Sequence, residues 1–332
     1  MTIEEITSAE ALEKLRPEWE ALWRSCDLAT PFLHPGWLIP WWEAFGPAEQ
    51  EPYVIIMRGE DGKLEGVAPA FSWRRQDGKR QLSFIGAGIS DYCGIVFAEG
   101  KGDLFAHEFI GRIAKRAGDV WDECALEDVM SGSPLLNAVS ALNKQRGAAC
   151  PVVSLPDSFD EYLAGLSGAK RERLLRAQKK LVRLGMRTEI AAPQETGRAT
   201  EIFFRLHEES WRHRGNEGVI NSAPLKKFYM KAAEALAQAG ALRLYLMGTD
   251  SPESVYAAAL FTMFHKKRVY CYLGGFAPEF EKLSAGSVIV MHAIKDAIEA
   301  GMYEFDFLRG GEAHKYSWGA MDKFNWNLTG ID

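Results

Sequence analysis

Four residues in the second half of the chain could carry acid–base chemistry. They are Glu208, Asp306, Lys315 and Tyr316. A carboxylate can take a proton from an attacking group, and a protonated side chain can give a proton to a leaving group. These side chains are therefore candidate catalytic residues. The further possible bases are His207, Glu209 and His314.

Each candidate also has a structural interpretation. Glu208 and Arg212 are four residues apart on a predicted helix, where opposite charges form ion pairs. Asp306 lies in the middle of a predicted strand and could be a buried partner of Arg309 or Lys315. Because positioning of the reactants can supply much of the rate, no single base is indispensable.

A strand, a loop, a helix and a second strand are predicted between residues 269 and 309. Aromatic residues alternate in Tyr270–Phe276, a loop follows at Ala277–Leu283, and Ser284 is a plausible N-cap for a helix to about Ala300. The helix begins with Ser-Ala-Gly-Ser, whose small side chains let a ligand approach the backbone. Its N–H groups and positive dipole end suit a phosphate group. The predicted cofactor contacts are Gly274, Gly275, Phe276, Lys282, Leu283, Ser284, Ala285, Gly286 and Ser287. Tyr303–Leu308 is the second strand.

The helix predicted at Glu195–Arg214 is expected to face the substrate. Phe203 and Leu206 are expected to point inward. His207, Trp211 and Arg214 share the other side, at steps of four and three residues. His207 and His213 are six residues apart and cannot form the i, i+4 pair of a zinc protease. With seven histidines and no clustered Cys/His set, we expect no metal site.

A basic amphipathic helix is predicted between the two halves. Lys170–Arg187 contains eight basic residues and one acid, Glu172, and the stripe formed by Arg173, Arg176, Lys180, Arg183 and Arg187 lies opposite an apolar face. The stripe is either a solvated surface or a contact for an anion. That anion could be the 3′-phosphate of coenzyme A, an acidic acceptor, a tRNA acceptor stem or lipid head groups.

The predicted helices and strands of the first half follow the same order as those of the second half. The two halves show no obvious repeat in their amino-acid sequence. Its segment Pro31–Phe45 is rich in tryptophan and reads as a helix packed under a sheet, or as an aromatic wall of a substrate cleft. A hairpin is predicted around Gly59–Gly62, and helices at Asp103–Ala117 and Pro134–Gln145. The last strand of the chain is predicted at Phe324–Leu328. We expect domains at residues 1–157 and 158–332.

Composition indicates a soluble globular protein. The chain has 332 residues, 47% of them hydrophobic and 25% charged, and its net charge of −6 argues against general DNA binding. No apolar run reaches the ~20 residues that cross a bilayer, and the N-terminus does not resemble a secretory signal. Five scattered cysteines without a CxxC pair suggest reduced core thiols, so we expect a cytoplasmic protein.

The chain resembles a known family in three sequence segments, which are LHEESWRHRG, YLGGFAPEFEKLSAGS and FDFLRGGEAHKYSWG. The sequence of these segments resembles that of the CelD-like GNAT-type N-acyltransferases, which are related to the Fem-type peptidyltransferases. The resemblance covers roughly residues 160–328 strongly and the first half weakly. It implies an α/β fold with two tandem GNAT-like acyl-CoA N-acyltransferase domains, whose mixed, mostly antiparallel sheets are flanked by helices.

The resemblance also implies roles for particular residues. Acetyl-CoA or another acyl-CoA would be the co-substrate, with the thioester carbonyl held by N–H groups beside Tyr272–Gly275 and the leaving sulfur protonated by Tyr316. The first half, which lacks an equally good phosphate loop, would supply a wall of the acceptor cleft. The expected substrate contacts are Asp91, Tyr92, His207, Trp211, Arg214, Tyr272, Arg309 and His314.

Three functions follow from these observations. The first is acyl transfer from an acyl-CoA to an amine of a small or envelope- or polysaccharide-linked acceptor. The second is a Fem-type transfer that uses aminoacyl-tRNA, which the basic helix permits and the net charge does not favour. The third is a non-catalytic binding component of a polysaccharide-synthesis system.

Overall fold

The structure is a computed structural model that describes residues 1–46, 52–138, 142–249 and 255–330. It contains two compact units. Unit 1 is Met1–Ala149 together with Lys323–Asp332, and unit 2 is Cys150–Asp322. The boundary therefore lies eight residues before the expected one, and the chain returns to unit 1 at its end. Both differences arise from two long strands at the boundary.

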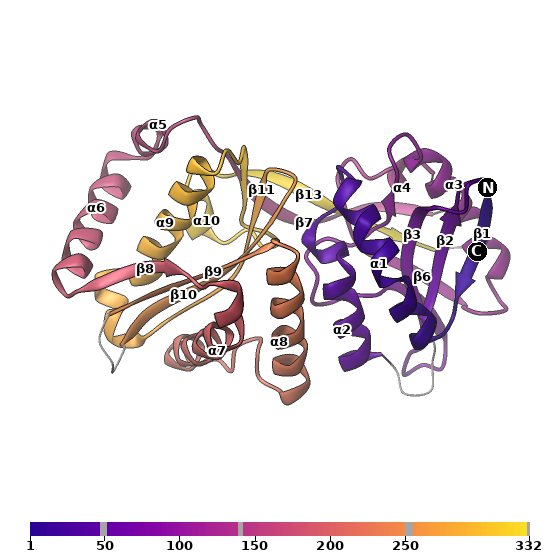
Figure 1. The fold of residues 1–332 in the computed structure, drawn as a ribbon, viewed down its shortest axis with the longest axis horizontal. Helices are drawn as coiled ribbons and strands as arrows, with labels where there is room; N and C mark the ends of the chain where they lie inside the picture. Colours follow the sequence, from indigo (N-terminus) through magenta and orange to yellow (C-terminus); the bar gives the residue numbers. More distant parts are fainter. Residues whose placement is uncertain (47–51, 139–141, 250–254, 331–332) are drawn as a thin grey trace. The chain divides into compact units, whose positions relative to one another are not determined.

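Unit 1 has a sheet in the order β1-β2-β3-β4-β6-β13, in which β1 to β4 are antiparallel and β6 is parallel to β4 (Figure 1). Helices α1 and α2 pack against one face, and α3 and α4 complete the core on the other. Its elements are β1 (Thr2–Ile6), α1 (Ala9–Ser25), η1 (Pro31–Leu33), α2 (Pro35–Phe45), β2 (Pro52–Arg58), β3 (Leu64–Arg74), β4 (Arg80–Phe84), β5 (Val96–Phe97), α3 (Gly102–Arg116), β6 (Glu123–Met130), α4 (Leu135–Ala138) and the first part of β7 (Asn143–Ser154).

Unit 2 has a sheet in the order β8-β9-β10-β11-β12-β7, in which β8 to β11 are antiparallel and β12 is parallel to β11. Its elements are α5 (Phe159–Gly165), α6 (Gly168–Arg183), β8 (Met186–Ile190), η2 (Pro193–Glu195), α7 (Thr196–His213), α8 (Ala223–Gln238), β9 (Leu242–Thr249), β10 (Tyr256–His265), β11 (Arg268–Phe276), η3 (Pro278–Leu283), α9 (Ala285–Glu299), β12 (Glu304–Asp306) and α10 (Ala313–Tyr316). The last strand, β13 (Met321–Thr329), belongs to the sheet of unit 1.

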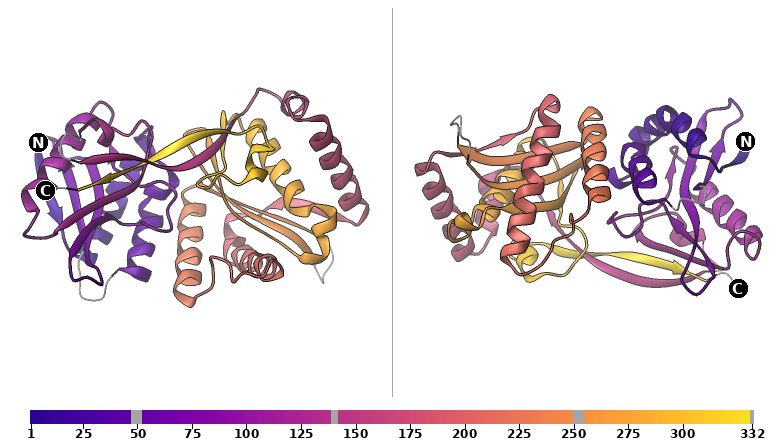
Figure 2. Two further views of the ribbon diagram at one scale, coloured as in Figure 1. Left: turned by 180° about the vertical axis from the view of Figure 1, so that it is seen from behind. Right: turned by 90° about the horizontal axis from the view of Figure 1, so that it is seen from below.

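Helices cover both faces of the sheet of unit 2 (Figure 2). On one face, Phe203 of α7 contacts Phe261 of β10, and Tyr229 of α8 contacts Tyr272 of β11. On the other face, α6 and α9 enclose a core with the sheet, and Tyr245 of β9 donates a hydrogen bond to Asp296 of α9. This core positions the beginning of α9 at the end of β11.

The two units repeat one arrangement and exchange their last strands. In both, three antiparallel strands are followed by a helix and a strand parallel to the third: β2-β3-β4, α3 and β6 in unit 1, and β9-β10-β11, α9 and β12 in unit 2. The next place in the sheet is filled by β13 in unit 1 and by β7 in unit 2. The fold is thus the expected mixed, mostly antiparallel α/β fold in two repeated halves.

Most predicted elements are confirmed, two predictions about strands and helices are wrong, and one strand was not predicted. The helix expected at Pro134–Gln145 contains only Leu135–Ala138, residues 139–141 lie outside the described part, and Asn143 already belongs to β7. The polar stretch from Asn143 to Arg146 is exposed, so it carries no apolar alternation that would indicate a strand. The last strand was assigned to the second half but pairs with β6 of unit 1. The strand β1 was not predicted, because Glu4 and Glu5 conceal its alternation.

The tryptophan-rich segment of unit 1 packs as a buried helix. Every residue from Pro35 to Trp42 is buried, and the rings of Trp41 and Trp42 lie 5.4 and 5.7 Å from the ring of Phe71. This favours the packing interpretation of Pro31–Phe45 over an aromatic wall. Among the described residues, none of the helices is both long enough and apolar enough to cross a membrane.

The backbone of α7 approaches β11 closely at Gly275. A Cβ atom at this residue would lie 2.5 Å from the carbonyl carbon of Leu206 and closer still to the backbone nitrogen of His207. Only glycine permits this contact between α7 and β11. At the neighbouring Gly274, a Cβ atom would meet Leu260 at an ordinary 3.4 Å.

We therefore expect Gly275→Ala to lower the free energy of unfolding by about 1–3 kcal/mol, because the added methyl group must displace the backbone of α7. Gly274→Ala is the matched control and should change the free energy by less than about 1 kcal/mol. Urea unfolding followed by circular dichroism measures both. Equal effects of the two substitutions would contradict this account of the contact.

Candidate functional site

One edge of β11 is open over its second half. Strand β12 pairs with β11 only from Arg268 to Tyr270, and among the described residues no strand pairs with this edge beyond that point. Strand β12 ends at Asp306, and the N–H of the next residue, Phe307, continues the ladder with β7 by donating to Pro151. The edge of Cys271–Phe276 is therefore left without a strand partner.

The register of β10 and β11 shows which backbone groups face the open edge. Ala277 donates its N–H to Ala257, which makes this a hydrogen-bonded pair of the antiparallel ladder. Such pairs alternate with pairs that turn their backbone groups outward. Gly274 and Phe276 occupy the outward-facing positions, so their N–H groups face the open edge. A bulge at Tyr272, between the Phe261–Leu273 and Thr262–Cys271 pairs, bends β11 at the start of this region.

His207 on α7 binds the carbonyl of Gly274. Its side chain is 1% exposed, and its Nδ1 lies 3.0 Å from that carbonyl oxygen. A carbonyl only accepts, so Nδ1 carries the proton and Nε2 does not; Nε2 is buried and has no hydrogen-bond partner among the described residues. Burial lowers the pKa of His207 below its ordinary value, with a smaller contribution from the charge of Arg214.

The start of α9 lies next to the end of β11. Ser284 occupies the predicted N-cap position in a left-handed conformation (φ 55°), although within the described residues its side chain makes no capping hydrogen bond. Its carbonyl accepts the N–H groups of Ser287 and Val288. Those of Ala285 and Gly286 have no acceptor among the described residues. Ala285 is fully buried, so of these two N–H groups the one at the half-buried Gly286 is accessible to a ligand.

The ring of Phe276 lies between the start of α9 and Arg214, the residue that follows α7. A Cβ atom at Gly286 would lie 3.5 Å from the Phe276 ring, and the guanidinium of Arg214 lies 5.7 Å from the centre of that ring. Arg214 also lies 4.7 Å from the ring centre of Trp211, which in turn packs beside His207. His207, Trp211 and Arg214 follow one another as helical spacing predicts, but His207 is buried against Phe203 and does not lie on the side away from it. A positive charge and the N–H group of Gly286 thus lie near Phe276, an arrangement that suits an anion.

The segment between β11 and α9 is a 3-10 helix instead of the expected irregular loop. In η3, Glu281 pairs with His213 of α7 at 3.1 Å, which ties the end of α7 to this segment. Lys282 is exposed, Leu283 packs against the core, and Ala285 is fully buried.

The turn after β12 is held by two of the predicted catalytic residues. The carboxylate of Asp306 accepts the N–H of Leu308, whose φ is 61°. Lys315 is buried and its Nζ donates to the carbonyls of Leu308, Arg309 and Gly310 at 2.6–3.2 Å. Both side chains therefore stabilise the turn, and their catalytic roles stay predictions.

The two remaining candidates on α10 are exposed. Tyr316 donates a hydrogen bond to Asp322 at 2.7 Å, and this bond raises the pKa of the tyrosine. His314 has its pKa lowered by partial desolvation. Arg309 is half-buried.

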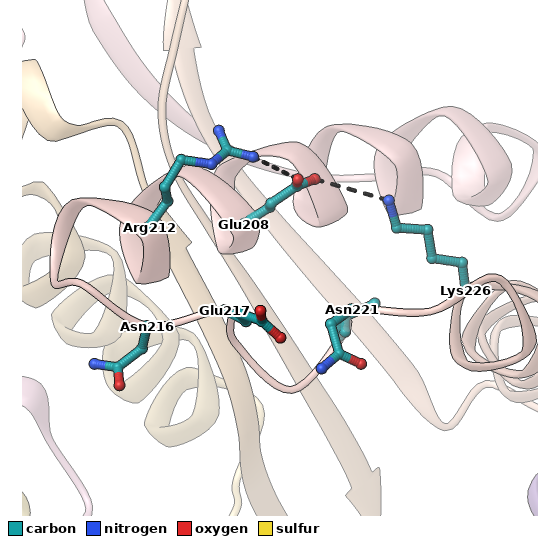
Figure 3. Close-up of a pocket in the computed structure, with 7 residues that line it drawn as sticks. Glu208, Arg212, Asn216, Glu217, Asn221 and Lys226 are labelled. Atoms are coloured by element: carbon teal, nitrogen blue, oxygen red, sulfur yellow. Dashed lines mark hydrogen bonds and ion pairs between the residues drawn. The ribbon is translucent and has the colours of Figure 1, made fainter.

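Glu208 lines a polar pocket of about 330 Å³ at the junction of α7 and α8 (Figure 3). Its carboxylate lies 2.5 Å from Arg212 and 3.7 Å from Lys226, so the predicted i, i+4 pair is present. The complete lining is Glu208, Arg212, Asn216, Glu217, Ile220, Asn221 and Lys226. A more open groove of about 580 Å³ adjoins it and shares Glu208 and Lys226.

Asp91 and Tyr92 are buried in unit 1. The carbonyl of Asp91 accepts a hydrogen bond from Asn325 of β13, and Tyr92 lines a cavity of about 10 Å³. Such a cavity has room for about one water molecule. Their role in substrate binding stays a prediction.

Sequence reasoning missed Lys170 and most of the pocket lining. Lys170 is buried, donates to Ser317 at 3.0 Å and lies 3.8 Å from the ring centre of Trp318. Burial lowers the pKa of this lysine to about 8. Its spacing from Leu174 and Ala177 placed it on the apolar side of α6, a signal that could have separated it from the basic stripe. In the described part of the chain, no three His, Cys, Asp or Glu side chains are grouped as a metal site would require.

Comparison with known families and structures gives this geometry a context. Residues 168–316 match the family model described as acetyltransferase (GNAT) domain. A search of the curated proteins found no match by sequence. The match covers the region that holds α6 to α10, including the open edge of β11 and the start of α9.

Solved structures share the fold over nearly the whole chain. The structure of FemX has a TM-score of 0.71 at 14% identity and covers 99% of this chain and 97% of its own. The C-terminal domain of a protein assigned as a lysylphosphatidylglycerol synthetase from Agrobacterium fabrum has a TM-score of 0.62 at 11% identity, covering 96% and 92%. The corresponding values for L-PGS from Bacillus licheniformis are 0.58, 10%, 98% and 93%. At these identities the likeness concerns the fold.

The lowered pKa of His207 predicts a pH dependence. The unfolded chain takes up the proton near pH 6.5 and the folded chain only at a lower pH, so the neutral side chain stabilises the fold above 6.5 and this contribution falls as the pH falls. His207→Asn keeps a donor near the Nδ1 position and does not titrate. We expect this variant to lose less unfolding free energy between pH 7 and 5 than the parent, measured by urea unfolding at both pH values. An equal or larger loss would contradict the assignment of a buried, neutral imidazole.

Proposed function

We propose that unit 2 transfers an acyl group from an acyl-CoA thioester to an amine, with acetyl-CoA as the expected donor. The observation that carries this proposal is the juxtaposition of the accessible N–H group of Gly286 with Arg214 and with the open edge of β11. The match of this region to the GNAT acetyltransferase domain supports it. The acceptor would be a small amine or an amine on an envelope or polysaccharide component.

The donor would bind along these elements in order. Its pyrophosphate would accept a hydrogen bond from the N–H of Gly286, and Arg214 would offset its charge. The amide-containing arm would pair with the open edge of β11 as an added strand would. An outward N–H group of Gly274 or Phe276 could then stabilise the charge that develops on the thioester oxygen.

The reaction itself exchanges one bond for another. The ammonium of the acceptor loses a proton, and the amine nitrogen attacks the thioester carbon to form a C–N bond. The nitrogen of the tetrahedral intermediate loses its second proton, the C–S bond breaks to leave a neutral amide, and the departing thiolate takes up one of the two released protons. Residues that hold the two reactants together supply much of the acceleration, and Glu208 remains the candidate base on the α7 side.

Gly286 gives the proposal its sharpest test. Gly286→Glu should leave the fold intact, since a carboxylate at a helix start favours the helix dipole, but should repel a pyrophosphate. We expect acetyl-CoA to raise the melting temperature of the parent and of the control Gly286→Ala, whose methyl group would meet Phe276 at 3.5 Å. Saturating ligand at 100 times Kd stabilises by about 2.7 kcal/mol. In Gly286→Glu the shift should disappear, and an undiminished shift would refute the assignment of the pyrophosphate site.

A second candidate is aminoacyl transfer from charged tRNA. It is favoured by the exposed basic stripe of α6, where Arg173, Arg176, Lys180 and Arg183 follow one another at helical spacing, and by the likeness of the fold to FemX. If tRNA is the donor, its binding should weaken steeply with salt, and Arg176→Glu with Arg183→Glu should weaken it at least tenfold. Stabilisation by acetyl-CoA without tRNA binding would exclude this candidate, and a response to neither ligand would favour a non-catalytic binding role.

A further inference from the structure

The polar pocket between α7 and α8 is built by an anchored connection. Gly218 packs against Trp211, where a Cβ atom would lie 3.0 Å from the indole ring, and Ile220 is only 3% exposed. Asn216 donates its N–H to the carbonyl of Trp211, and Ser222 caps the start of α8 by accepting the N–H of Leu225. These contacts fix the backbone that carries the polar side chains of the lining.

Charge is distributed unequally within this pocket. Arg212 and Lys226 share a single carboxylate, that of Glu208, which leaves one positive charge in surplus on that side. Glu217, on the connection, pairs with no cation among the described residues. Figure 3 shows Glu208 between Arg212 and Lys226, with Glu217 and Asn221 projecting from the connection. The pocket thus combines one uncompensated negative charge with one uncompensated positive charge.

We propose that this pocket binds a small zwitterion whose ammonium pairs with Glu217 and whose anionic group pairs with Lys226 and Arg212. Asn216 and Asn221 supply amide groups that can bind further polar atoms of the ligand. A volume of about 330 Å³ lies at the small end of ligand sites, so an amino acid or a molecule of that size fits better than a macromolecular segment.

A zwitterion satisfies the pocket better than a singly charged ligand. A simple amine would leave Lys226 and Arg212 with their surplus charge, and a simple anion would leave Glu217 uncompensated beside it. The pocket has equal numbers of acidic and basic side chains, so it offers no net attraction to a ligand of one sign. That this zwitterion is the acceptor of the acyl group rests on the proposed function, whereas its binding does not.

The experiment measures binding to the full chain in the absence of any acyl-CoA. The probes are 4-aminobutyrate, butylamine and butyrate, which share a carbon skeleton and carry both charges, the positive charge or the negative charge. Isothermal titration or saturation-transfer NMR at low ionic strength should show 4-aminobutyrate binding at least tenfold more tightly than either single-charge probe. Glu217→Gln and Lys226→Met should each weaken it at least tenfold.

Controls separate this pocket from general charge effects. Lys227→Met, in the adjoining groove but not in the pocket lining, and Glu279→Gln, on η3, should leave the affinity unchanged. Equal affinity for the three probes, no detectable binding of 4-aminobutyrate, or unchanged binding in Glu217→Gln would each overturn the proposal. Acetyl-CoA binding to the same samples is scored separately, so loss of one result does not imply loss of the other.

Discussion

The contact between α7 and β11 is the constraint on which the candidate site depends. Gly275 lets the backbone of α7 rest directly on the strand, and this closeness brings His207 within hydrogen-bond distance of Gly274. A strand edge whose carbonyls are unpaired would ordinarily attract another strand. Here a buried imidazole occupies one carbonyl, while the N–H groups that face the same edge stay accessible. Helix α7 therefore covers the sheet and also occupies one backbone carbonyl on the open edge of β11.

The edge of β11 is left unpaired because of the neighbouring strand β12. Strand β12 is only three residues long, because Asp306 and Lys315 together stabilise a left-handed turn at Leu308. A longer β12 would pair with β11 and close the edge. Charged residues that suggested catalysis in the sequence thus serve to keep two strands apart. Their burial and their hydrogen bonds to the backbone are consistent with this use.

The features that could be predicted from the sequence are those that depend on residues close together in the chain. Ser284–Ala300 could be identified as a helix from local signals, and the grouping of His207, Trp211 and Arg214 follows from helical spacing alone. The partner of Gly274 could not be predicted, because it lies 67 residues away on another element. The exchange of β7 and β13 was missed for the same reason, since strand pairing between distant segments leaves no local pattern. The pocket at Glu208 depends on Glu217 and Asn221, which the sequence shows only as polar residues of a glycine-bearing connection.

Selective labelling offers the most direct test of the central claim, which is that backbone amides at the end of β11 and the start of α9 bind the donor. In a protein labelled with 15N-glycine, addition of acetyl-CoA should shift the amide resonances of Gly286 and Gly274, while those of distant glycines such as Gly240 stay in place. If Gly286 and Gly274 keep their resonances at saturating acetyl-CoA, the donor does not bind at this strand edge and the account is wrong.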